Sequence, residues 1–104
     1  MSNASLESHL AALAAAGETV TYGDLARDLG LRIADLTAQL EALMEADAAQ
    51  GKPFRAALLR QRLSPDGHPA PGFFLKTAEL GRTVDIATER QALFAAARPA
   101  TSPP

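Results

Sequence analysis

The chain contains no cysteine, and only two histidines and five aromatic residues among its 104 positions. The absence of cysteine excludes disulfide bonds, thiolate nucleophiles and zinc sites with cysteine ligands. His9 and His68 are isolated, without a second ligand at a metal-like spacing, so we expect no bound metal. A base-stacking surface needs several aromatic residues on an exposed sheet, and this chain has few to supply.

Long apolar runs and glycine-rich phosphate loops are also missing. No stretch is apolar over the length that a bilayer crossing needs, and no basic-then-apolar leader is visible. Together with the lack of cysteine, this fits a cytoplasmic protein without a membrane segment. Gly51 and Gly81 stand alone, outside any motif that would cradle a nucleotide. We therefore expect no cofactor.

No catalytic constellation is visible in the sequence. Ser64, Asp66 and His68 are the residue types of a triad, but they are too close in one turn to form the nucleophile–base–orienter geometry. Residues remote in sequence can still converge in a fold. On the pattern alone, we expect a protein that is not an enzyme.

The composition is that of an ordinary globular protein, with 47% hydrophobic and 21% charged residues. A chain of this length forms one domain, and neither an internal repeat nor a dividing linker is present. We expect a single domain over residues 5–97. Residues 98–104 contain proline and serine and are expected to be a disordered tail.

The centre of the chain, residues 21–44, predicts two helices joined by a tight turn. Thr21 is a suitable N-cap for the first helix, and Gly30 is suited to end it in a left-handed conformation. The second helix is indicated by an apolar stripe of Ile33, Leu36, Leu40, Leu43 and Met44. These are the parts of a helix-turn-helix, although an ordinary helical hairpin uses the same parts.

The flanking segments predict further helices and a small β-hairpin. Helices are expected at 5–16, at 73–80 and from Ile86 onward, the last with Asp85 as its N-cap. Residues 18–20 are expected to add one short strand, whereas 54–63 fits either a strand or a helix. The Ser-Pro-Asp-Gly run that follows favours a hairpin turn, which would be a wing. The expected fold is mainly α with a small β-hairpin, a winged-helix-like helix-turn-helix domain.

The run Val20-Thr21-Tyr22-Gly23-Asp24-Leu25-Ala26 resembles the opening of the helix-turn-helix in alkylguanine-DNA alkyltransferases and alkyltransferase-like proteins. The order of the expected elements is similar over about three quarters of the chain. The resemblance implies a winged-helix fold. It also implies that Tyr22 lies beside a DNA backbone.

The chain departs from that family at the residues that carry its chemistry. The Pro-Cys-His-Arg motif would fall within 54–63, where nothing like it is present. Without cysteine there is no alkyl acceptor, so transferase activity is excluded. The family's arginine in the second helix has no counterpart, because Ala34 and Asp35 lie near its place. The resemblance therefore supports a fold more than a function.

The charges are divided unevenly along the chain, whose net charge is −2. Eight acids face two bases up to Gly51, and eight bases face four acids after it. This division fits either one basic face or, as we slightly favour, pairing between the two halves. The second central helix is expected to expose the acids Asp35, Glu41 and Glu45 and no base, which disfavours contact with phosphates.

These charges lead to two functional hypotheses. The first is a non-catalytic protein-interaction or accessory domain that binds a basic partner through Asp35, Glu41 and Glu45. The alternative is nucleic-acid binding, with phosphate contacts from Tyr22, Arg60 and Arg62. A homodimer is also consistent with the alanine-rich, apolar-faced terminal helices.

Overall fold

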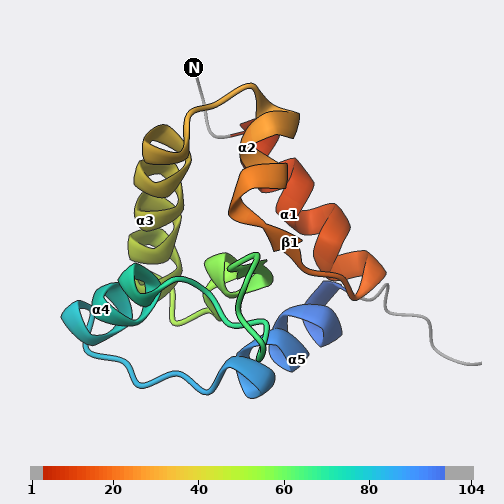
Figure 1. Ribbon diagram of the computed structural model, residues 1–104. Helices are drawn as coiled ribbons and strands as arrows, with labels where there is room; N and C mark the ends of the chain where they lie inside the picture. Colours follow the sequence, from red (N-terminus) through yellow and green to blue (C-terminus); the bar gives the residue numbers. More distant parts are fainter. Residues whose placement is uncertain (1–3, 98–104) are drawn as a thin grey trace, which may run out of the picture.

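The computed structural model in Figure 1 describes residues 4–97, which form helices around one short β-sheet. In chain order the elements are α1 (Ala4–Ala16), β1 (Val20–Thr21), α2 (Tyr22–Leu29), α3 (Ile33–Ala49), the 3-10 turn η1 (Arg55–Leu58), β2 (Leu59–Arg60), α4 (Pro71–Glu79) and α5 (Ile86–Ala97). The helices predicted at 5–16, 73–80 and from Ile86 are thereby confirmed. The disordered tail predicted at 98–104 lies outside the described residues.

The two central helices meet at a glycine turn, as the sequence predicts. The hydroxyl of Thr21 accepts a hydrogen bond from the backbone N–H of Asp24 (3.2 Å), which caps α2. Gly30 ends α2 with a φ of 68°, a left-handed conformation that glycine adopts without a Cβ clash. The N–H of Leu31 then donates to the carbonyl of Ala26 (2.8 Å), which closes the turn.

The apolar stripe of α3 is buried except at its first residue. The buried members are Leu36, Leu40, Leu43 and Met44. Ile33 is 50% exposed instead, because it stands in the first turn of α3, at the rim of the core. Its side chain lines a surface groove that is described below.

The segment 54–63, predicted as either strand or helix, contains the 3-10 turn η1 and then the two-residue strand β2, and its last residues form a turn. β2 pairs with β1 in parallel, with Val20 opposite Leu59 and Thr21 opposite Arg60. The predicted strand near residues 18–20 is therefore present, shifted to Val20–Thr21. β2 ends at Arg60, which leaves Leu63 89% exposed.

The predicted β-hairpin is wrong, because the only sheet in the described residues is this parallel pair. The Ser64–Gly67 segment does turn the chain back, but the returning residues form no strand. A single backbone hydrogen bond joins the two sides, from Gln61 N–H to the His68 carbonyl (2.9 Å). Pro69 and Pro71 lack the N–H groups that further ladder bonds would need.

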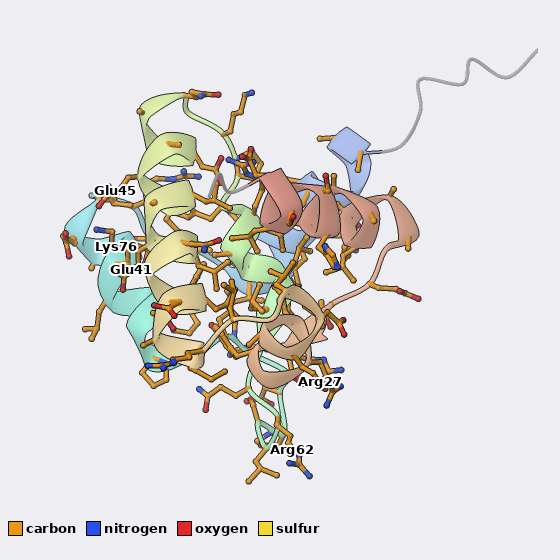
Figure 2. All side chains as sticks on the ribbon, turned by 90° about the horizontal axis from the view of Figure 1, so that it is seen from above. Arg27, Glu41, Glu45, Arg62 and Lys76 are labelled. Carbon is orange, nitrogen blue, oxygen red and sulfur yellow. The ribbon has the colours of Figure 1, made fainter. Side chains whose placement is uncertain are left out.

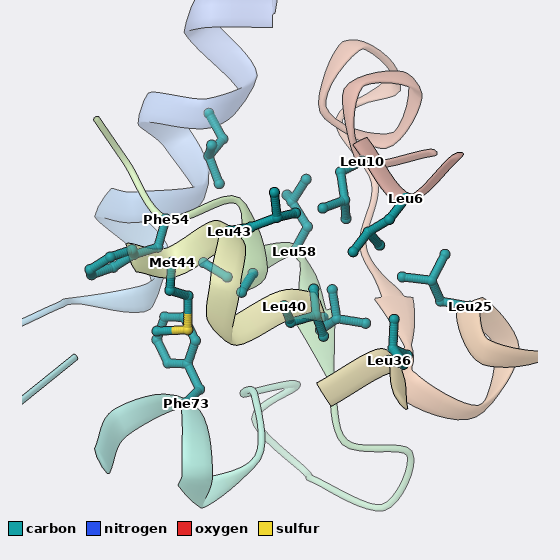
Figure 3. Packing of buried hydrophobic residues seen from close by; sticks show 14 of the residues in the cluster. Leu6, Leu10, Leu25, Leu36, Leu40, Leu43, Met44, Phe54, Leu58 and Phe73 are labelled. Atoms are coloured by element: carbon teal, nitrogen blue, oxygen red, sulfur yellow. The ribbon is translucent and has the colours of Figure 1, made fainter. Parts of the chain in front are cut away.

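One hydrophobic core joins all the helices, as Figure 3 shows. Its labelled members from the first three helices are Leu6, Leu10, Leu25, Leu36, Leu40, Leu43 and Met44. Phe54 and Leu58 enter from the η1 region, and Phe73 enters from α4. The rings of Phe54 and Phe73 meet edge to face, with centroids 6.1 Å apart. Phe73 thereby holds α4 against the core.

The last helix packs against the same chain. Asp85 caps α5 by accepting a hydrogen bond from the N–H of Thr88 (2.9 Å), as predicted. α5 contacts α1 and η1, and it buries Ile86 and Leu93. No helix in residues 4–97 combines the length and the apolar character needed to cross a membrane.

Candidate functional site

Part of the predicted charge pairing between the two halves of the chain is present. Arg55 lies between Asp47 (2.9 Å) and Glu7 (3.0 Å), and so joins η1, α3 and α1. Asp47 is buried, and it also accepts a hydrogen bond from the backbone N–H of Arg55 (3.0 Å). These ion pairs hold η1, α3 and α1 together. Because the charges pair with one another, we do not treat the cluster as a candidate binding surface.

The predicted acidic face of α3 is smaller than the sequence suggests. Asp35 and Glu41 are exposed, as predicted. Glu45 is also on the surface, but its carboxylate accepts from the ammonium of Lys76 on α4 (2.7 Å). Figure 2 shows Lys76 beside Glu45, with Glu41 further along the same helix. The pairing leaves Asp35 and Glu41 as the carboxylates of this face that have no ion-pair partner within residues 5–97.

The three residues predicted to contact phosphate lie around one surface hollow. Tyr22, Arg60 and Arg62 line it together with Arg27, and its volume is about 890 Å³. We call it the arginine hollow, defined by these four residues. Arg27 reaches it from α2, where it pairs with Asp24 (2.8 Å). Sequence reasoning missed Arg27, although it lies on the helix that Tyr22 begins.

The partners of these residues in the described chain leave positive charge in the hollow. Arg60 donates through Nε to the hydroxyl of Thr19 (3.1 Å), a neutral acceptor. Arg62 is exposed, and within residues 5–97 neither arginine pairs with a carboxylate. Burial raises the pKa of Tyr22, so this phenol is neutral at physiological pH. Its hydroxyl accepts from the N–H of Ala70 (3.0 Å) and retains a proton to donate.

Arg90 adds a further cation behind the hollow. Its guanidinium donates to the carbonyls of Ala57 (2.7 Å), Leu59 (3.2 Å) and Gly67 (2.8 Å). Burial, and then the neighbouring charge of Arg60, lower the pKa of Arg90. These three carbonyls accept from its Nε and Nη2 groups but do not cancel its charge. The sequence carries a signal for this role, because Arg90 falls on the same side of α5 as buried Ile86 and Leu93.

A second concavity, which sequence reasoning missed, lies between α3 and the start of α4. We call it the α3–α4 groove. Ile33, Thr37, Leu40, Glu41 and Met44 line it from α3, and Ala70, Gly72 and Phe73 line it from the other side, with Tyr22 and Ala56. Its volume is about 260 Å³. Most of these side chains are apolar, so the groove suits apolar groups of a ligand.

Tyr22 lines both the arginine hollow and the α3–α4 groove. The two concavities therefore adjoin at this side chain. At about 260 Å³ the groove is smaller than typical pockets for drug-sized molecules and cofactors, which begin near 300 Å³. It suits one or two anchoring side chains of a larger partner.

The described residues offer little for metal binding or for a triad. No group of three histidine, cysteine, aspartate or glutamate side chains in residues 5–97 is arranged to hold a metal ion. In the Ser64–His68 turn, the serine hydroxyl accepts from the backbone N–H of His68 (3.2 Å). This contact stabilises the turn and does not activate the hydroxyl as a nucleophile.

Comparisons with protein-family models, with curated proteins and with solved structures gave no match to this chain. Function is therefore inferred from the two concavities that meet at Tyr22. They differ in chemistry, because one is lined by arginines and the other mostly by apolar side chains.

Proposed function

We propose that this chain is a non-catalytic binding module that holds a segment of a partner protein in the α3–α4 groove. One observation carries the proposal: an apolar groove is open beside the exposed carboxylate Glu41 and is bordered by Ile33, which is 50% exposed. Anchoring side chains that fill such pockets supply most of the affinity in protein interfaces. The proposal keeps Glu41 as a partner contact and assigns Glu45 to the ion pair with Lys76. It does not extend to Asp35, which is exposed but does not line the groove.

We also propose that the domain is winged-helix-like. The glycine turn between α2 and α3 supports this assignment, as does the resemblance carried by residues 20–26. In this chain the wing would be the turn at Ser64–Gly67, closed by the hydrogen bond from Gln61 to His68. Strands do not build it, because β2 pairs with β1 and not with the returning segment.

The groove hypothesis is tested with a matched pair of substitutions. Peptides are selected from a random display library on the full chain, and their binding is measured by fluorescence anisotropy. Ile33→Asp places a charge on the groove wall, in the first turn of α3, where an acid is compatible with the helix dipole. Leu75→Asp places the same charge on α4, where Leu75 is 73% exposed and lies outside the groove lining.

We expect Ile33→Asp to weaken peptide binding about tenfold or more, because an anchor would meet a charge. Leu75→Asp should bind as the wild type does. Circular dichroism checks that both variants keep their helices. Peptides that bind both variants equally, or a library that yields no binder, would count against the proposed function.

Nucleic-acid binding is the second candidate, and the convergence of Tyr22, Arg60 and Arg62 around one hollow favours it. Phosphate binding should fall steeply with salt, because it releases counterions. Anisotropy with a labelled duplex and a labelled single strand, at low and near-physiological salt, measures this dependence. The double variant Arg60→Glu, Arg62→Glu should abolish the binding.

A matched double variant controls for net charge in that experiment. Arg32→Glu with Lys52→Glu makes the same change in charge at exposed residues that do not line the hollow. It should bind nucleic acid nearly as well as the wild type. We rank this candidate second because the exposed carboxylates of α3 would repel phosphates approaching that helix.

A further inference from the structure

The α3–α4 groove has a negative charge on its α3 side and positive charges beyond Tyr22. Glu41 is part of its lining on the α3 side, and it has no ion-pair partner within residues 5–97. The neighbouring carboxylate, Glu45, is paired with Lys76, which also pairs with Glu79, and Glu45 does not line the groove. Glu41 is therefore the carboxylate that an occupant of the groove meets at that wall.

The opposite charge lies past Tyr22. This side chain separates the groove from the arginine hollow, where Arg60 and Arg62 have no carboxylate partner within the described residues. Arg90 adds a further positive charge close by, since its guanidinium donates to the carbonyl of Leu59, the residue before Arg60. Figure 2 places Arg62 on a different side of the molecule from Glu41 and Glu45.

We propose that the groove selects an amphipathic segment of a partner protein and binds it in one direction. The segment carries apolar anchors for the groove, a basic residue that reaches Glu41 and an acidic residue that reaches Arg60 and Arg62. This inference rests on the proposed function and adds the chemistry of the partner. Charge complementarity of this kind sets the register and direction of an interface more than its raw affinity.

A nucleic acid fits this combined surface less well than a protein segment does. Its phosphates could use the arginine hollow, but the next phosphate along the groove would approach Glu41. The groove offers mostly apolar side chains and few of the hydrogen-bonding groups that read base edges. A segment with charges of both signs satisfies both concavities together.

Charge reversal with compensation tests the direction of binding. The probe is the tightest peptide from the display selection, measured by anisotropy on the full chain. Arg62→Glu and Glu41→Lys reverse the two proposed contacts. Lys52→Glu and Glu18→Lys make the same changes at exposed residues that line neither concavity.

We expect the selected peptides to share one order of charge around their apolar anchors. Each proposed reversal should weaken binding about fivefold, while each control stays within about twofold, as expected for exposed charge pairs. Replacing the acidic residue of the peptide with lysine should restore its binding to Arg62→Glu and weaken its binding to the wild type. Such a restoration of binding is expected only if the acidic residue of the peptide contacts residue 62 directly.

The other outcomes separate the two levels of the proposal. If peptide binding depends on Ile33 but is unchanged by Arg62→Glu and by Glu41→Lys, the proposed charge order is wrong and the proposed function stands. A library with no binder that depends on Ile33 would overturn the proposed function, and the inference with it. An unlabelled DNA strand that displaces the peptide, and itself loses binding in Arg62→Glu, would overturn the inference in favour of nucleic acid.

Discussion

The hydroxyl of Tyr22 accepts a hydrogen bond of 3.0 Å from the backbone N–H of Ala70. Tyr22 begins α2, and Ala70 directly precedes α4, so the bond joins two segments that are distant in sequence. It also fixes the side chain that stands between the arginine hollow and the α3–α4 groove. The geometry of both concavities therefore depends on this contact.

Substituting Tyr22→Phe should lower stability because it leaves the N–H of Ala70 without its acceptor. We expect the free energy of unfolding to fall by about 1 kcal/mol, the usual net value of one such bond. Urea unfolding followed by circular dichroism measures the change. An unchanged unfolding midpoint would mean that water replaces the hydroxyl without cost.

The titration of Tyr22 is directly measurable, because it is the only tyrosine in the chain. Burial raises its pKa in the folded protein, against weaker opposing effects of the Ala70 hydrogen bond and the Arg90 charge. The folded state therefore holds this proton more tightly than the unfolded state, and its stability should fall as pH rises above about 10. Ultraviolet absorbance of tyrosinate should show a higher midpoint in buffer than in urea. Equal midpoints would contradict the burial of this side chain.

Arg90 is expected to stabilise the turn between β2 and α4. Arg90→Met removes the donors for three carbonyls, those of Ala57, Leu59 and Gly67, so the free energy of unfolding should fall by about 2 kcal/mol. Gln91→Met, at the exposed neighbouring position, is the control and should change stability little. Equal unfolding midpoints for the two variants would exclude this role.

Asp85 should make the stability sensitive to acid. Hydrogen bonds from the side chain and then the backbone of Thr88 lower the pKa of Asp85. Its contribution is therefore present above the unfolded pKa of about 3.9 and is lost as pH falls through the lower folded value. Asp85→Asn keeps a capping side chain but does not titrate. Urea unfolding across this pH range should show a smaller acid-side loss of stability in the variant, and an identical loss would count against the prediction.

The sequence predicted the elements whose signals are local. Thr21, Gly30 and Asp85 mark helix ends because each acts on a backbone only a few residues away. The parallel pairing of Val20 with Leu59 could not be read in this way, since no local pattern specifies a partner so far along the chain. The hairpin prediction failed for the same reason: the turn signal was correct, but the pairing partner of β2 was not.

The candidate site was predicted only in part. Tyr22, Arg60 and Arg62 do converge, and the structure adds Arg27 to them. The groove was missed because it depends on where α4 lies against α3, which the sequence of neither helix specifies. The pairing of Glu45 with Lys76 depends on that same tertiary contact.

The predicted homodimer is an independent question that sedimentation velocity answers. Ile33, Leu63 and Leu75 are the exposed large apolar side chains of the described residues, which a second copy would cover. A species of twice the monomer mass that disappears in Ile33→Asp would show that the groove also serves association between copies. A monomer at all concentrations would leave the groove open to other proteins.

The most direct measurement is the footprint of a selected peptide on the isotope-labelled chain, mapped by two-dimensional NMR. The proposed function predicts that the largest backbone shifts cluster at Ile33, Thr37, Tyr22 and Phe73, which line the α3–α4 groove. The surfaces of α1 and α5 should change little. Shifts concentrated on α1 and α5, with the groove residues unmoved, would contradict the central claim.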